Sequence, residues 1–385
     1  MRKGLESLPS SEMPQILEDL IFGEKAESKN ILEFPLPTHY SNLFEKNFQL
    51  ALKSKRVLLH VDFTLEAVCS AVLLYKILKQ NGVSPSLNFA TRENEGFGNQ
   101  FKILLNSSKL KNVDFVLICG FSQKPEIPNS IHFPQNEEIF SENPVTLVWT
   151  LVQKLNLGIP NELPLLLAFQ NGFTALVGSN FEVFSNLRKE NLEIQLKELC
   201  LRIENLFEIF EVEEKTPKCF EEQQKFLMKI LVNALRFGRS ELVFKVLTEG
   251  QETKQLENCL KILIQKYLQR KSLLKLFEEK LQNGNFEFYG NDETDFCVLV
   301  GHFELGFLRI FARTLANKTG KNSILISTKL RNEKIGTIFG LDSFKRNFFN
   351  NFEVYFKNRR LTKSKCWFRL RGLNGKEIFE ILQQL

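Results

Sequence analysis

Four acidic or imidazole side chains lie in or beside apolar runs that predict buried strands. His60 and Asp62 lie at the end of the run Val57–Val61, Glu66 follows four residues later, and His132 lies within a later run. Carboxylates and imidazoles are common protein ligands of divalent metal ions. Two such ions held close together can activate a water for hydrolysis, but they need several carboxylates to balance their charge. This set supplies too few, so we expect no catalytic pair of metal ions here.

The elements that must position these groups are a strand and a helix. The run Val57–Val61 predicts a buried strand, a short polar bend follows, and Ala67 and Ser70 open an apolar helix that ends near Gly82. Small residues at a helix start allow its backbone to lie close to a strand end. Open α/β sheets place their chemistry at that end.

The strand and helix together resemble the first motif of the DHH phosphoesterases, the family that contains the RecJ nucleases. The family pattern is approximately His-x-Asp-x-Asp-Gly-x-x-Ser-Ala. In an ungapped alignment on Ser70, the family His falls on Asp62, the first Asp on Thr64 and the second Asp on Glu66. A second register keeps His60 and Asp62 in place and needs two extra residues before Ser70. Both registers lack at least one metal carboxylate.

Three later segments resemble the remaining DHH motifs, in the same order. An apolar run ends in Gly120 where the family has a metal-binding Asp, and residues 130–134 keep only His132 and Pro134 of Asp-His-His-x-Pro. Asn171 stands where the fourth motif has its Asp. The resemblance implies a retained fold and a lost metal site, with degenerate motif positions at Asp62, Thr64, Glu66, Gly120, Ser130, His132 and Asn171.

Apolar periodicity divides the chain into four parts. Residues 1–50 predict a leader with short helices, and residues 51–180 alternate strands and helices, which is typical of a parallel sheet with covering helices. Residues 181–285 predict helices alone, and the alternation returns in 286–385. We therefore expect an α/β protein with two lobes of parallel or mixed sheet, joined by a helical segment. The second lobe resembles the carboxy-terminal lobe that accompanies DHH domains, although residues 363–366 lack its Gly-Gly-His turn.

The expected elements are specific enough to be compared with a structure. The predicted strands are 57–61, 86–90, 113–118, 130–133, 297–301, 323–327, 352–357 and 366–372. The predicted helices are 66–80, 101–106, 146–155, 192–210, 220–237, 241–247, 256–281, 304–318 and 375–385.

The second lobe is strongly basic. Residues 313–371 carry fifteen Lys and Arg against three acids, with aromatic residues between them. A cationic groove with stacking rings is typical of proteins that bind single-stranded nucleic acid. In the alternative, the rings are core residues and the basic surface meets an acidic protein. The candidate nucleic-acid-binding residues are Lys345, Arg346, Arg359, Arg360, Lys363, Lys365, Arg369 and Arg371.

The helical segment begins with an acidic stretch. Residues 182–214 contain nine acids and four bases. This pattern fits a solvated helix face or a docking face for a partner.

Composition limits the class of protein. The 385 residues suffice for two or three domains. No apolar run reaches the ~18–20 residues of a membrane span, and the amino terminus lacks an apolar signal core. The seven cysteines lie far apart, as expected for buried thiols in a reducing compartment. We expect a cytoplasmic, nucleoid-associated protein without a cofactor and without membrane contact.

The family resemblance implies a RecJ-like pseudonuclease. It is most similar to the inactive RecJ relative in the replicative helicase of archaea and eukaryotes, and the compact chain favours the archaeal type. By that resemblance the protein would bridge the GINS complex and the MCM ring and contact single-stranded DNA. One alternative is an active metal-dependent single-strand exonuclease or nucleotide phosphodiesterase, in which Asp62, Glu66, His132 and His60 hold an ion. A stand-alone single-strand-binding module is the other alternative.

Overall fold

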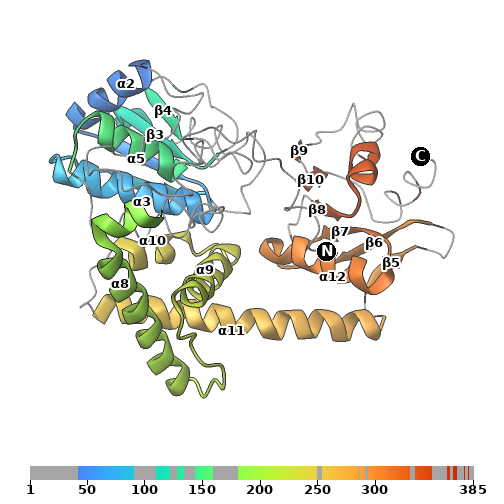
Figure 1. Cartoon of the computed structure of the whole chain (residues 1–385). Helices are drawn as coiled ribbons and strands as arrows, with labels where there is room; N and C mark the ends of the chain where they lie inside the picture. The colour runs from blue at the N-terminus through green and yellow to red at the C-terminus, as the bar shows by residue number, and fades with distance from the viewer. Residues whose placement is uncertain are drawn as a thin grey trace, which may run out of the picture.

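The fold is described by a computed structural model (Figure 1). It describes residues 42–90, 110–121, 127, 129–133, 144–158, 181–248, 254–284, 286–290, 294–329, 334–348, 362–364, 367–370, 377 and 380. The predicted helix 101–106 and strand 352–357 lie outside these residues, as does most of the predicted helix 375–385.

The first lobe is built on a parallel four-stranded sheet with the strand order β2-β1-β3-β4. Its strands are β1 (Val57–Val61), β2 (Ser86–Phe89), β3 (Phe115–Cys119) and β4 (Ser130–Phe133). The predicted strands at 57–61 and 130–133 are confirmed in full, and the other two are displaced by at most two residues. Strand β2 lies on one side of β1, and β3 lies on the other side. The strand order therefore reverses between β1 and β3, and open sheets bind ligands at such a switch point.

Helices cover one face of this sheet, namely α2 (Asn42–Lys53), α3 (Leu65–Gln80) and α5 (Pro144–Lys154). Thr64 caps the start of α3, and Asn81 caps its end before Gly82, whose φ of 79° is left-handed. Most of α3 is buried, from residue 65 to 74 and at Ile77 and Leu78, because other helices pack on its outer side. On the opposite face of the sheet, Leu58 forms a smaller apolar cluster with side chains of β3.

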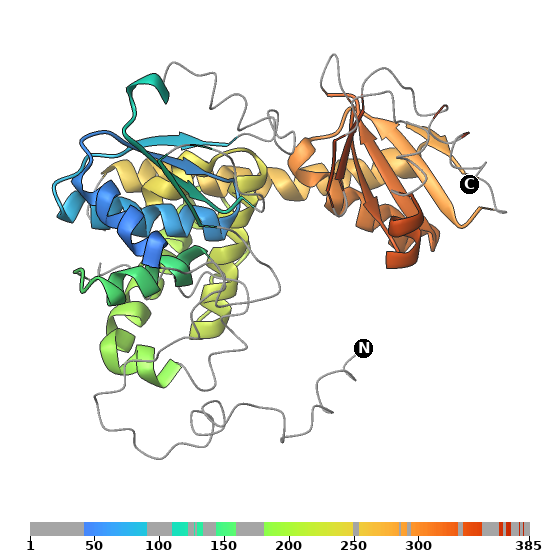
Figure 2. The same ribbon diagram turned by 90° about the horizontal axis from the view of Figure 1, so that it is seen from above.

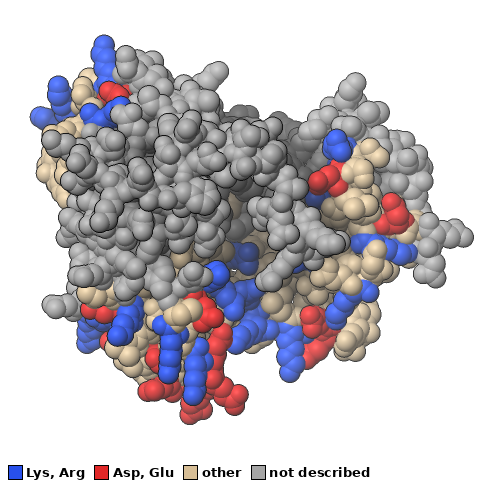
Figure 3. All heavy atoms as spheres, viewed as in Figure 1, with Lys and Arg blue, Asp and Glu red and all other residues tan. Residues whose placement is uncertain are grey.

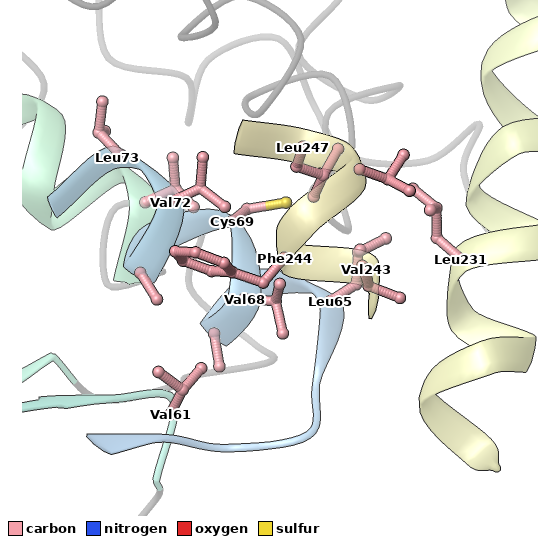
Figure 4. Close-up of a cluster of buried hydrophobic side chains, with 14 of the residues drawn as sticks. Val61, Leu65, Val68, Cys69, Val72, Leu73, Leu231, Val243, Phe244 and Leu247 are labelled. Carbon is pink, nitrogen blue, oxygen red and sulfur yellow. The ribbon is translucent and has the colours of Figure 1, made fainter. Parts of the chain in front are cut away.

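Four helices follow, and strands are absent from this part of the chain where it is described, as predicted. They are α8 (Phe181–Ile209), α9 (Phe220–Arg236), α10 (Ser240–Thr248) and α11 (Lys254–Gln282). Figure 4 shows Val243, Phe244 and Leu247 of α10 directed at Val68 and Cys69 of α3. The first sheet and the helical segment therefore share one hydrophobic core.

The second lobe is a mixed six-stranded sheet with the order β5-β6-β7-β8-β10-β9, in which only β6 and β7 are parallel neighbours. Its elements are β5 (Glu287–Tyr289), β6 (Phe296–Gly301), the 3₁₀ turn η5 (Leu305–Phe307), α12 (Leu308–Thr319), β7 (Asn322–Ser327), β8 (Lys334–Phe339), β9 (Thr362–Ser364) and β10 (Trp367–Leu370). Gly320 ends α12 in the left-handed conformation, as its position predicts.

Sequence reasoning missed three strands of this sheet. Strands β5 and β9 have three residues each, which is too short for a period-two pattern. Strand β8 contains Gly336, which weakens its β-forming signal. The ring of Phe368 on β10 occupies the space that a Cβ at Gly336 would need, so the neighbouring strand accounts for this glycine.

Two contacts connect the lobes. Helix α11 runs beneath both of them (Figures 1 and 2), with Ile264 and Tyr267 in the first core and Phe277 in the second. The end of α9 also reaches the second lobe, because the rings of Phe237 and Phe307 lie 4.7 Å apart between centroids. No described helix has both the length and the apolar character needed to cross a membrane.

Candidate functional site

The candidate site is the carboxyl end of β1 and β3, on either side of the switch point. Asp62 and Gly120 are the first residues after these strands. The backbone N–H of Asp62 donates to the carbonyl of Cys119 at 3.0 Å, and that of Gly120 donates to the carbonyl of Phe133 at 2.8 Å. These hydrogen bonds extend the ladder by one residue, so the two positions lie side by side at the strand ends, where the resemblance to the DHH motifs implies metal ligands.

Gly120 is the position at which the structure differs most clearly from a metal-binding site. Its φ is 85°, a conformation that residues with a Cβ rarely adopt. A Cβ built there would collide with the Cβ of Ala67 and would lie 3.2 Å from the Ala67 Cα and 3.3 Å from the Asp62 Cβ. Helix α3 thus packs against a strand end that has no side chain, and a carboxylate at position 120 would require α3 to move.

The turn between β1 and α3 uses its polar groups locally. Asp62 Oδ1 accepts a hydrogen bond from the Phe63 N–H at 2.8 Å, and Thr64 Oγ1 accepts one from the Ala67 N–H at 3.3 Å. Glu66 is buried in the first turn of α3. Burial, and secondly the nearby Glu66 carboxylate, raise the pKa of the Cys69 thiol. In this segment Thr64 therefore acts as a helix cap, and Glu66 is a helix residue one turn beyond the strand end.

His60 points to the other face of the sheet. Alternation along β1 directs Val57, Leu59 and Val61 toward the helices and Leu58 and His60 away from them. The His60 ring stacks on Phe121 at 4.8 Å, and its Nδ1 lies 2.9 Å from the side-chain nitrogen of Asn88. Burial lowers the pKa of His60 to about 4, so it is neutral at pH 7.

His132 has one ring nitrogen committed to the backbone. Its Nε2 lies 2.6 Å from the carbonyl oxygen of Phe121. A carbonyl can only accept, so Nε2 carries the proton and cannot also coordinate a metal ion. Its neighbour Ser130 donates its hydroxyl to the Ile127 carbonyl at 2.7 Å.

The structure does not gather these groups around a common point. Among the described residues, which include His60, Asp62, Glu66 and His132, there is no group of three or more His, Cys, Asp or Glu side chains placed to hold a metal. Cys119 is buried at the end of β3, and burial raises its thiol pKa to about 12. Asn171 lies outside the described residues.

The basic second lobe is described only in part. Lys345 forms an ion pair with Asp342 at 3.0 Å, and Arg346 Nε lies 3.4 Å from the Asp342 carbonyl. Lys363 on β9 pairs with Phe368 on β10, and Arg369 pairs with Thr362, the residue before Lys363. The other candidate residues lie outside the described part, namely Arg359, Arg360, Lys365 and Arg371.

Several aromatic residues of this lobe belong to its core. Phe348 and Phe368 are buried, with ring centroids 5.3 Å apart, and Phe344 stacks on Phe296. The alternative that these rings are core residues is therefore confirmed for Phe348 and Phe368. They are not available to stack on nucleic-acid bases.

Two features of the structure escaped sequence reasoning. The contact between Gly120 and Ala67 joins residues 53 positions apart, and its only sequence signal is a glycine after a strand together with an alanine at a helix start. A second cluster ties the turn after α8 to α11, with Tyr267 donating to Glu214 at 2.9 Å and Lys271 paired with the same carboxylate at 2.7 Å. Nothing in the sequence marks this cluster.

The chain has the two-lobe fold of the RecJ-like DHH proteins. The RecJ of Thermus thermophilus in complex with Mn²⁺ matches with a TM-score of 0.58 and 13% identity over 92% of this chain, which spans 55% of that protein. An exonuclease RecJ bound to manganese matches at 0.57 and 14% identity, covering 92% of this chain and 94% of that one. CDC45 from Entamoeba histolytica matches at 0.51 and 10% identity, covering 89% and 97%. No family model matches the sequence, and no curated protein does.

Proposed function

We propose that this protein is a catalytically inactive RecJ-like protein that acts as a structural subunit of a DNA replication helicase. By family resemblance it bridges the GINS complex and the MCM ring. The proposal includes the division of the chain into a leader (1–50), a degenerate DHH-like domain (51–180), a helical linker (181–285) and a basic carboxy-terminal lobe (286–385). The likeness to the Entamoeba CDC45 supports the non-catalytic assignment.

One observation carries the proposal, namely the packing of Ala67 against Gly120 at the switch point. A two-metal phosphoesterase needs carboxylates at adjacent strand ends to balance the charge of its ions. Here one of those strand ends is filled by a helix, and its neighbour Asp62 is engaged in the turn. The same surface still joins the sheet to α3, so the fold can persist as a scaffold without a hydrolytic site.

The test is a nuclease assay with a matched variant. Purified protein is incubated with Mn²⁺ and single-stranded DNA or short oligoribonucleotides, beside Glu66→Ala. We expect no turnover by either protein and no rise in melting temperature on adding Mn²⁺. Turnover that is abolished by Glu66→Ala would reject the proposal in favour of an active exonuclease or phosphodiesterase.

The partner assignment needs a separate experiment. Co-purification from the native source should recover GINS and MCM subunits with this chain. Recovery of single-stranded DNA without either complex would favour a stand-alone single-strand-binding module instead. The fifteen basic residues against three acids in 313–371 are the specific observation behind that second candidate.

A further inference from the structure

Helix α8 exposes a row of large apolar side chains. Ile194, Leu201 and Ile209 have exposed fractions of 52%, 57% and 64%. They are seven and eight residues apart, which returns each side chain to the same side of an α-helix. Of the eight large hydrophobic residues exposed among the described residues, three lie on this one helix. We call the surface formed by Ile194, Leu201 and Ile209 the α8 stripe.

The α8 stripe is not needed to hold the helix in place. The opposite side of α8 is buried in the main core through Leu196, Ile203, Leu206 and Phe207. Residues on this inner side account for the packing of α8 against α9 and α11. The exposed side chains on the outer side are therefore available for a contact that the fold itself does not use.

Acidic residues border the α8 stripe. From 194 to 213 the acids are Glu198, Glu204, Glu208, Glu211 and Glu213, against the bases Lys197 and Arg202, a difference of 5 − 2 or three net negative charges. Glu208, Glu211 and Glu213 are exposed. Figure 3 shows acidic side chains at the lower end of the molecule, where α8 ends and turns toward α9, with Lys and Arg side chains between them. The chain as a whole carries a net charge of +6, so this surface has the opposite sign.

We propose that the α8 stripe docks a basic amphipathic helix of a partner protein. The apolar row spans about 22 Å of helix, or roughly four turns, which matches one aligned partner helix. Apolar side chains of that helix would cover Leu201 and its neighbours, and flanking Lys or Arg would meet Glu208 and Glu213. Nucleic acid is excluded as the occupant because its phosphates carry the same sign of charge. The inference rests on the proposed scaffolding function and adds the chemistry of one partner contact.

The test uses the full chain and a fluorescent synthetic peptide of about three heptads, with leucine at the a and d positions and lysine elsewhere. We expect saturable binding that weakens as salt rises. Leu201→Ser should weaken it by about fivefold, because part of a leucine surface is no longer buried. Glu208→Lys with Glu213→Lys should weaken it by a similar factor and flatten its salt dependence. Leu341→Ser, at a leucine 69% exposed in the second lobe, and Glu278→Lys on α11 are the matched controls.

Four outcomes would overturn the inference. Equal affinity of Leu201→Ser and the parent chain would remove the α8 stripe as the site. Equal binding of a peptide with glutamate in place of lysine would remove the charge argument. A concentration-dependent dimer that is lost in Leu201→Ser would assign the stripe to a second copy of this chain. If helicase subunits co-purify equally with Leu201→Ser and the parent chain, this inference fails and the scaffolding function stands; if none co-purify with the parent chain, the scaffolding function fails.

Discussion

The packing at Gly120 predicts an unusually costly substitution of glycine by alanine. Gly120 has a φ of 85°, and a Cβ there would collide with the Cβ of Ala67. Gly82 provides a matched control, because its φ is 79° and a Cβ there would have no atom within 4 Å. The two glycines share the backbone conformation and differ in what surrounds it.

The expected cost has two parts. An L-residue in the left-handed conformation loses about 1–2 kcal/mol. Forcing an extra methyl group into a packed core costs about 1–3 kcal/mol more. Gly120→Ala should therefore lower the free energy of unfolding by about 2–5 kcal/mol, whereas Gly82→Ala should lower it by about 1–2 kcal/mol.

Urea unfolding followed by circular dichroism measures both variants. We expect the same dependence on urea and a lower midpoint for Gly120→Ala. Ala67→Gly in the Gly120→Ala background should recover about 1 kcal/mol or more relative to the sum of the single changes, because it removes the colliding methyl group. Costs for Gly120→Ala and Gly82→Ala that agree within about 0.5 kcal/mol would refute the steric argument, and with it the observation that carries the proposed function.

Three further predictions concern other parts of the chain. Between pH 7 and pH 5 the parent chain should lose about 2 kcal/mol of stability through His60, and His60→Gln should not show this loss. The folded-state pKa of His60 is about 4 against 6.5 when unfolded, so only the unfolded chain takes up a proton as pH falls from about 6.5 toward 4. Gly306→Val should loosen the contact between the lobes, seen as wider particle dimensions in X-ray scattering, because a Cβ there would collide with the Arg236 carbonyl. Charge reversal at Arg359 and Arg360 should weaken single-stranded DNA binding and flatten its salt dependence.

Each of these has a contrary result. An unchanged slope of stability against pH in His60→Gln would show that His60 takes up its proton equally in the folded and unfolded states. Gly158→Ala is the control, because a Cβ at Gly158 would meet only the Gln80 Oε1, at 3.5 Å. If Gly306→Val and Gly158→Ala have equal particle dimensions, the α9 contact does not hold the lobes together. A DNA affinity with an unchanged salt slope after reversal of Arg359 and Arg360 would reject the basic lobe as the binding surface.

Strand and helix identity could be predicted where the apolar pattern is long. The helices at 220–236 and 254–282 are within two residues of their predicted limits. The fold class of two lobes with a parallel and a mixed sheet is also confirmed. Pattern reasoning failed for β5 and β9, which have three residues each, and for β8, whose β-forming signal Gly336 weakens.

For the candidate site, the sequence predicts which metal-ligand residues are missing but not how the remaining side chains are oriented. The sequence shows that Thr64 and Gly120 are not carboxylates, and this needs no coordinates. It does not show that His60 points away from α3, because the direction of a side chain depends on the pleat of β1 within the assembled sheet. Nor does it show that a proton on Nε2 of His132 is held by the Phe121 carbonyl.

The sequence by itself determined the order of elements and the chemistry that is missing, because local periodicity and residue type are properties of neighbouring residues. Only the tertiary structure decided that Ala67 fills the space beside Gly120 and that α8 leaves Leu201 uncovered. Both are contacts, or absences of contact, between segments distant in the chain. Close packing of a folded interior fixes these relations, and the pattern of a single segment does not encode them.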